Sequence, residues 1–438
     1  MIRAILICSC LSMSLAATLI PNRLRVEYMV EPRGVDEPQP RFSWALASDN
    51  RGQAQTAYQI VVKSEDAGSA VVFDSGKVMS NRSTNVVLSL PAAGSGHQFN
   101  ATTQYSWTVT AWDSTGVKGP ASAPAHFSTG VQGDWKNAAW IGSAAGKQQG
   151  TLLRHEFSVP SGCNVERAFV YSVGLGYYKL HLDGTRVSDH ELGAFTTFTK
   201  RVYYDTVDVT AALRTENADH ALGVALGAGW YEQKTVNVGQ RSLLLRLHAK
   251  LSGCSTPTLD VVSSTSSWTT ATGPVTMDDI YAGENYDARL EQVGWDQAGF
   301  APHTAWAPSS AVAPPSANVT VDSHAVLPPI RIGETYAPCD MWQSSAGVYV
   351  FDFCQNMAGF TTLRLPAGLS PGATITQRHA EAIKCAKPCP IFHHYRNTAE
   401  TTNYTTGSSY SAVEYTPLFT YMGYVHRSSF ATSLSPDH

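Results

Sequence analysis

The chain has 438 residues, a length that suits two to four domains and a sizeable apolar core. Only 15% of the residues are charged and 43% are hydrophobic, while Ser, Thr and Gly are abundant, which is typical of a secreted β protein. The formal net charge of −4 comes from scattered side chains, without a basic stripe that could neutralise a phosphate backbone. Nucleic acid is therefore not expected as a partner.

The N-terminal sequence MIRAILICSCLSMSLAATL has the features of a signal peptide. Arg3 supplies the positive charge, residues 4–15 form an apolar stretch, and residues 14–16 form a small-x-small cleavage site. A membrane anchor would need about 18 to 20 apolar residues, and this run is shorter. We expect residues 1–16 to be removed, the mature protein to be secreted to the extracellular space, and no membrane partner.

Four N-x-S/T sequons fit a eukaryotic secretory route and predict a glycoprotein. Their acceptor residues are Asn81, Asn100, Asn318 and Asn403.

Six cysteines remain after the signal peptide, an even number that predicts disulfides in an oxidising compartment. They are Cys163, Cys254, Cys339, Cys354, Cys385 and Cys389. Proximity along the chain favours Cys163 with Cys254 and pairing within the other four, although sequence cannot choose among all the pairings. A zinc site built on these cysteines is not expected, because no two C-x-x-C pairs occur.

Short runs of alternating polarity, rather than helical periodicity, predict an all-β fold of tandem β-sandwich domains. Residues 22–130 contain about seven such runs, among them TQYSWTVTAWDSTG, and are expected to form a fibronectin-III-like sandwich. Trp44 and Trp107 lie on the inward phase of their strands, which indicates core positions rather than exposed sugar platforms.

Two further β units follow along the chain. Residues 150–310 are expected to form a larger sandwich of jelly-roll type and a possible carbohydrate-binding module, with a hairpin turn at Asp183-Gly184. Residues 309–320 are rich in Pro, Ala and Ser, which predicts a linker. Residues 319–434 are expected to form a third β-sandwich.

The stretch DDIYAGENYDARLEQVGW, residues 278–295, could supply the two carboxylates of a glycosidase. We interpret it as scaffold instead. Asp278 and Asp279 are expected to end a strand and solvate a turn, and Glu284, Asp287 and Arg289 are spaced for a loop held by side-chain and ion-pair bonds. A carboxylate beside Arg is expected to have a low pKa, whereas a general acid needs a raised pKa.

Sugar binding is the favoured functional interpretation of the second unit, because lectin sites combine aromatic platforms with carboxylates and carboxamides, sometimes through calcium. The alternative is that the aromatic side chains pack inward at a glycine-rich strand end. The candidates are Trp230, Tyr231, Asn237, Glu284 and Asn285.

Two candidates in the third unit are weaker. Glu381 and His379 would share one face of a strand, and we favour an interdomain contact over a catalytic role for them. His393 and His394 are not expected to share a metal ion, because adjacent residues on a strand point to opposite faces.

The sequence resembles the N-terminal portion of the α-L-rhamnosidases, inverting glycoside hydrolases that remove terminal L-rhamnose. The resemblance spans nearly the whole mature chain and rests on VGLGYYKLHLDGTRVSDHELGAFTTFTKRVYYDTVDVT, LGVALGAGWY, DDIYAGENYDAR, FDFCQNMAGF and RHAEAI. It implies family-motif structural roles for Asp287, Arg289, Asp352, Gln355, Asn356 and Glu381. Some rhamnosidases also carry a calcium-dependent rhamnose-binding module of this sandwich type.

The resemblance also implies that the family's catalytic acid and base lie on a helical (α/α)₆ barrel. A barrel of about twelve helices needs several hundred residues, and we expect it to be absent here because few residues follow FTYMGY. The family pattern has Gly where this chain has Cys354, which favours recruitment of that thiol into a bridge.

We therefore expect the N-terminal, non-catalytic portion of a rhamnosidase that acts on terminal L-rhamnose of plant glycans or glycosides, with no cofactor or with calcium. A stand-alone secreted lectin-like module and a truncated gene model are the alternatives.

Overall fold

The computed structural model describes residues 19–90, 96–146, 150–214, 219–233, 236–301, 306–355, 357–380, 382–383, 392–393, 401–407, 412–425 and 427–431. The predictions for residues 1–16, Asn356, Glu381, Cys385, Cys389 and His394 lie outside these ranges. The described chain divides after Gln132 into two compact units.

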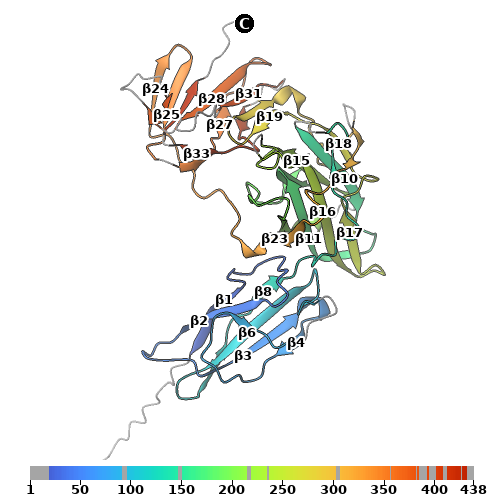
Figure 1. The fold of residues 1–438 in the computed structure, drawn as a ribbon, viewed down its shortest axis with the longest axis vertical. Coiled ribbons are helices and arrows are strands. Elements are labelled where there is room, and N and C mark those ends of the chain that lie inside the picture. Colours follow the sequence, from blue (N-terminus) through green and yellow to red (C-terminus); the bar gives the residue numbers. More distant parts are fainter. Residues whose placement is uncertain are drawn as a thin grey trace, which may run out of the picture. The chain divides into compact units, whose positions relative to one another are not determined.

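Strands dominate both units (Figure 1). Within the described ranges, helical structure is confined to α1 (Thr210–Leu213) and the 3₁₀ turns η1 (Glu65–Ala67), η2 (Ala288–Leu290) and η3 (His324–Val326). None of the helices in these ranges is long and apolar enough to cross a membrane. The predicted all-β class of tandem sandwiches is thus confirmed.

The first unit is a sandwich of two antiparallel sheets. One sheet has the order β1-β2-β5 and the other the order β4-β3-β6-β7, with β8 also paired to β6. The strands are β1 (Ile20–Val26), β2 (Arg41–Ala47), β3 (Ala57–Ser64), β4 (Ala70–Asp74), β5 (Val86–Val87), β6 (Gln104–Trp112), β7 (Lys118–Ala121) and β8 (Ala125–Ser128).

Aromatic side chains fill the space between these two sheets. The ring of Phe42 meets that of Trp107 edge-on at 4.8 Å between centroids, and both side chains are buried. Trp44 is buried too, and its indole N–H donates to Oε1 of Gln55 at 2.9 Å, so its polar atom is satisfied. Both tryptophans are core residues, as the alternation predicted.

The second unit begins with a larger sandwich of two long sheets, with the orders β13-β12-β15-β10-β18-β21 and β22-β9-β16-β11-β14-β23; β17 also pairs with β16. Val and Leu side chains from the facing strands form its core. The strands are β9 (Ile141–Gly142), β10 (Thr151–Ser158), β11 (Asn164–Leu175), β12 (Tyr177–Leu182), β13 (Thr185–Arg186), β14 (Arg201–Asp208), β15 (Asp219–Gly227), β16 (Ser242–Ser252), β17 (Thr258–Val262), β18 (Thr269–Thr272), β21 (Ala307–Pro308), β22 (Ser310–Ala311) and β23 (Thr320–Ser323).

The predicted hairpin turn joins β12 to β13. Asp183 and Gly184 both have positive φ, 50° and 79°, as a type I′ turn requires. The Asp183 carboxylate accepts a hydrogen bond from the backbone N–H of Ala221 at 2.8 Å and lies 2.7 Å from Nδ1 of His220. The turn is therefore anchored to the neighbouring strand by its own side chain.

A third layered region follows, with a sheet of order β19-β20-β31-β28-β34-β25-β24 and the short pairs β26-β33, β27-β32 and β29-β30. Its strands are β19 (Val275–Asp279), β20 (Gly283–Asp287), β24 (Asp340–Ser345), β25 (Val348–Asp352), β26 (Met357–Gly359), β27 (Leu363–Leu365), β28 (Thr374–Ala380), β29 (Ala382–Ile383), β30 (Phe392–His393), β31 (Thr401–Thr405), β32 (Val413–Tyr415), β33 (Met422–Val425) and β34 (Arg427–Ala431).

This sheet crosses the boundary expected near residue 310. Strand β20 pairs in parallel with β31, so that Glu284 lies beside Thr402. The aromatic side chains of Tyr286, Tyr404 and Tyr415 pack together on it, with ring centroids 4.8 to 5.7 Å apart. Residues 275–287 therefore belong to the third sheet, because they complete its edge and cover part of its core.

Among the described residues, two disulfides lie in the second unit. Cys163 pairs with Cys254, the partner that chain proximity favoured, and Cys339 pairs with Cys354. The second bridge includes Cys354, the thiol that was expected to be recruited into one.

Candidate functional site

Glu284 is the central carboxylate of residues 278–295. Its side chain is completely buried, and its oxygens accept hydrogen bonds from the Tyr415 hydroxyl at 3.0 Å and from the backbone N–H groups of Leu418 and Phe419 at 3.0 and 2.9 Å. Burial raises the pKa of Glu284 to about 7, against the opposing effect of these hydrogen bonds. The expected low pKa beside Arg289 is thus wrong for Glu284, because the Arg289 guanidinium binds Asp287 instead.

The bonds to Glu284 hold residues 418–419 against the sandwich. The Phe419 ring packs over Gly227, where even a Cβ atom would come within 2.2 Å of the ring. Leu152, Tyr177 and Ala225 belong to the same buried cluster as Phe419. Glu284 therefore joins the third region to the second sandwich, which is a structural task.

Asp287 and Arg289 form the predicted ion pair, but Glu284 and Asp287 lie on strand β20 and Arg289 in the 3₁₀ turn η2, not in a loop. Oδ1 of Asp287 accepts from the Arg289 backbone N–H at 3.0 Å and from Nε at 2.9 Å, and Oδ2 accepts from Nη2 at 2.7 Å. These bonds lower the pKa of Asp287. Because Arg289 is exposed, the pair contributes little to global stability.

Asp278 and Asp279 behave differently from each other. Asp279 accepts from the backbone N–H groups of Tyr281 and Ala282 at 2.8 Å and stabilises a turn, as expected. Asp278 does not solvate a turn. It is buried and lies 3.1 Å from Nη1 of Arg241, which is itself 1% exposed.

Arg241 is the centre of a buried ionic network. Its Nη2 lies 2.7 Å from Oε2 of Glu232, and its Nη1 also donates to the carbonyl of Leu226 at 3.2 Å. Asp278 additionally accepts from the backbone N–H of Ala228. The network ties the end of β15 to β19, so these carboxylates are engaged in holding strands together.

The sugar-binding candidates do not converge on one surface. Tyr231 and Glu284 are buried, 1% and 0% exposed, so neither reaches solvent to contact a sugar, and their prediction as sugar ligands is wrong. Asn285 is half-buried and accepts a hydrogen bond at 2.8 Å from Nδ2 of Asn403. Asn237 is exposed, in a loop with positive φ.

Trp230 alone among these candidates lines a large cleft in the second unit. The cleft has a volume of about 1230 Å³, and Phe195, Tyr336 and Tyr421 also line it. Trp230 is half-buried and packs against Phe195 at 5.1 Å between ring centroids. Trp230 is thus the one of these candidates that a ligand in the cleft could contact.

The family-motif residues of the third region support a turn. Asp352 is buried, and its carboxylate accepts from the backbone N–H of Cys354 at 2.8 Å. Gln355 is exposed and donates to the Tyr336 hydroxyl at 3.3 Å. His379 is buried on β28, whereas its suggested partner Glu381 lies outside the described residues.

The described sequons differ in exposure. Asn81, Asn100 and Asn318 are exposed, whereas Asn403 is half-buried and its Nδ2, the atom that would carry a glycan, donates to Asn285.

The sequence reasoning missed a cluster formed by His190, Asp205 and His324. Nδ1 of each histidine lies 2.9 Å from the same oxygen, Oδ1 of Asp205. The three residues are far apart in the chain, and parallel pairing of β14 with β23 brings the last two together. No spacing rule in the sequence signals such a contact.

Comparison with known families accounts for most of the chain. Residues 21–133 match the Rha78A-like N-terminal immunoglobulin domain, residues 163–334 the α-L-rhamnosidase N-terminal domain, and residues 343–428 the bacterial α-L-rhamnosidase concanavalin-like domain.

Individual relatives agree. An α-L-rhamnosidase from Alteromonas sp. is 30% identical over 98% of this chain and 47% of its own length. The solved α-L-rhamnosidase of Dictyoglumus thermophilum is 30% identical with a TM-score of 0.83, covering 95% of this chain and 47% of that protein. That of Aspergillus terreus is 26% identical with a TM-score of 0.81, covering 96% and 48%.

The chain thus spans less than half the length of these relatives. Together, the three matched domains and the common fold show that this chain belongs to the α-L-rhamnosidase family and carries its N-terminal β domains.

Proposed function

We propose that this chain is the non-catalytic β portion of an α-L-rhamnosidase-type glycoside hydrolase that acts on terminal L-rhamnose of plant glycans or glycosides. The observation that carries the proposal is the likeness of nearly the whole chain to rhamnosidases more than twice its length. The names of these relatives support L-rhamnose as the sugar. Secretion, with residues 1–16 as the signal peptide, is part of the proposal and is supported by the two disulfides.

The state of the carboxylates in residues 278–295 supports a non-catalytic role. A glycosidase needs one carboxyl group as acid and a second as base or nucleophile, both facing the sugar. Glu284 has the raised pKa of an acid, but its oxygens are occupied by backbone N–H groups in a fully buried position. Asp278 and Asp287 are each held by an arginine.

Assay of the purified chain on p-nitrophenyl α-L-rhamnopyranoside tests this proposal. We expect no release of p-nitrophenol above the enzyme-free rate. Turnover that is absent from a Glu284→Gln or Glu381→Gln variant would overturn it.

A stand-alone lectin-like role is the second candidate, and the position of Trp230 in the aromatic cleft favours it. A shallow sugar site would bind with a dissociation constant near 1 mM, or about −4 kcal/mol. Calcium could bridge protein and sugar, in which case a chelator would abolish binding.

Titration of L-rhamnose, with D-galactose as the control sugar, tests the lectin-like role. Wild type and Trp230→Ala would be compared by amide chemical shifts, with and without calcium. A saturable response to L-rhamnose that Trp230→Ala loses supports the lectin. The absence of a response below about 20 mM, well beyond the millimolar scale, leaves the cleft without a sugar-binding role.

A further inference from the structure

His190, Asp205 and His324 come together from three separate segments of the second unit. Asp205 lies on β14, His190 lies in the loop after β13, and His324 begins η3 directly after β23. The parallel register pairs Tyr204 with Ser323, so the next residues of the two strands, Asp205 and His324, are neighbours. The pairing of β14 with β23 therefore places Asp205 beside His324 without the help of a ligand.

The donor atoms of the cluster point at one spot. Both Nδ1 atoms lie 2.9 Å from Oδ1 of Asp205, and one donor atom from each of the three residues can be chosen so that all lie within 4.8 Å of one another. The imidazole planes are nearly perpendicular, at 87°, so the rings approach from different directions instead of stacking. A small cation requires such convergence of donor atoms.

Neighbouring side chains hold the Asp205 carboxylate in place. The Tyr178 hydroxyl donates to Oδ2 of Asp205 at 2.7 Å and lies 2.9 Å from Oγ of Ser172. The Tyr203 ring stacks on the imidazole of His324, with centroids 5.8 Å apart. Outer contacts of this kind orient the ligands of protein metal sites.

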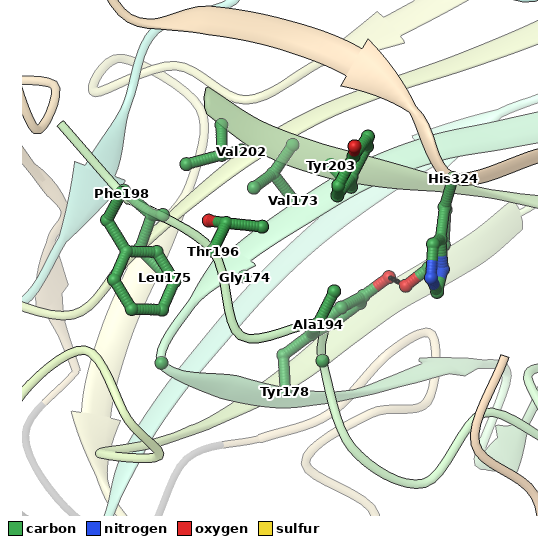
Figure 2. A pocket seen from close by; sticks show the side chains of 13 residues that line it. Val173, Gly174, Leu175, Tyr178, Ala194, Thr196, Phe198, Val202, Tyr203 and His324 are labelled. Atoms are coloured by element: carbon green, nitrogen blue, oxygen red, sulfur yellow. Dashed lines mark hydrogen bonds and ion pairs between the residues drawn. The ribbon is translucent and has the colours of Figure 1, made fainter. Parts of the chain in front are cut away.

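The cluster also adjoins open space. Figure 2 shows Tyr178, Tyr203 and His324 around a small pocket of about 30 Å³, which Asp205 lines as well. This volume accommodates about one water molecule. The histidine and aspartate side chains are 12 to 20% exposed, so an ion can reach them from solvent.

We propose that His190, Asp205 and His324 form a zinc site whose fourth ligand is a water molecule in the adjoining pocket. Two imidazole nitrogens, one carboxylate oxygen and water are a ligand set that Zn²⁺ takes in tetrahedral geometry, with bonds of about 2.0 to 2.2 Å. Such bonds place neighbouring ligand atoms about 3.3 Å apart, so the present 2.9 Å contacts need to open only slightly. Each neutral imidazole then carries its proton on Nε2.

The ion would fasten the segment around His324 to the second sandwich. Nearby, the Glu191 backbone N–H donates to the carbonyl of Ile330 at 2.9 Å, and Nε of Arg331 donates to Oδ2 of Asp189 at 2.6 Å. The site thus lies where the chain leaves the sandwich toward the third region. The prediction against zinc considered cysteine ligands alone and did not weigh these residues.

Zinc titration of the full chain after removal of metal by a chelator tests the proposal. We expect wild type to bind zinc with a dissociation constant on the order of 1 µM or below. His324→Ala should raise that dissociation constant by about 100-fold or more. His181→Asn is the matched control, because His181 also contacts a carboxylate, that of Asp296 at 2.6 Å, but belongs to no group of three metal-ligating side chains among the described residues. Its zinc affinity should equal that of wild type.

Cobalt binding provides a second measurement, the visible spectrum of wild type, which does not require any single variant to fold. Co²⁺ bound to wild type should give the intense visible absorption of a tetrahedral site, and both His190→Asn and Asp205→Asn should lose it. Wild type that binds no zinc, or variants that retain wild-type affinity and the cobalt spectrum, would overturn the proposal. The cluster would then be only a carboxylate that accepts two imidazole N–H bonds.

Discussion

Replacing Glu284 by Gln should change how stability depends on pH. Burial raises the pKa of Glu284 in the folded protein to about 7 from an ordinary value of 4.5. The folded state therefore holds a proton between these pH values that the unfolded state has released, so the stability contributed by protonated Glu284 is complete below about pH 4.5 and is lost as the pH rises through 7.

The size of the effect follows from the shift in pKa. A difference of about 2.5 units at roughly 1.4 kcal/mol per unit amounts to about 3 kcal/mol. Gln has the shape of the protonated acid, so its carbonyl can accept from Leu418 and Phe419 while its amide donates to the oxygen of Tyr415. Relative to wild type, Glu284→Gln should gain about 3 kcal/mol between pH 4.5 and 8.

Urea unfolding of both proteins at pH 4.5 and 8, together with amide exchange at Leu418 and Phe419, measures this difference. Taking the difference at each pH cancels the titration of all other groups. Glu291→Gln, at an exposed position in the same segment, is the control and should show no such gain. A pH-independent difference between Glu284→Gln and wild type, or one of opposite sign, would refute the argument that burial dominates at Glu284.

Three further predictions concern the second unit. Arg241→Met should destabilise it by about 3 to 5 kcal/mol, because Glu232 and Asp278 would remain buried without their cation. The control, Arg289→Met, should cost about 1 kcal/mol or less. Equal losses of stability in urea unfolding would contradict this contrast. Replacing Cys163 and Cys254 by Ser should cost about 4 to 5 kcal/mol of stability, because their bridge closes a loop of 91 residues. The same change at Cys339 and Cys354 should cost roughly 3 kcal/mol, because that loop has 15 residues. The opposite order of unfolding midpoints would contradict this prediction. Thiol titration of the denatured, non-reduced mature chain should find at most two free thiols. Four cysteines are paired, and Cys385 and Cys389 lie outside the described residues. A count of about six free thiols would show that the bridges are absent.

Local patterns in the sequence predicted much of the fold. Trp107 and its neighbours alternate along a single strand, and the Asp183-Gly184 turn is encoded by two adjacent residues. Cys163 and Cys254 are neighbours in cysteine order, and the backbone of two adjacent antiparallel strands, β11 and β16, brings them together. Each of these features depends on residues whose relation can be read along the chain.

The role of Glu284 could not be predicted in the same way. Its neighbour in sequence, Arg289, suggested an ion pair, but its actual partners lie at Tyr415, Leu418 and Phe419. Tyr415 ends β32 and the other two residues follow it, 131 to 135 residues from Glu284 along the chain, so no local signal marks the contact. Burial then reversed the direction of its pKa shift, because burial depends on packing by distant residues.

The central claim is that the carboxylates of residues 278–295 have structural roles and do not catalyse hydrolysis. The most direct test is the rate at which this chain hydrolyses p-nitrophenyl α-L-rhamnopyranoside. Wild type, Glu284→Gln and Glu381→Gln would be compared from pH 4 to 8 at high enzyme concentration, after repeated purification. We expect all three to match the enzyme-free rate at every pH. Wild-type turnover of about 1 to 1000 per second, the usual range for enzymes, that survives repurification and is lost in Glu284→Gln would contradict the account.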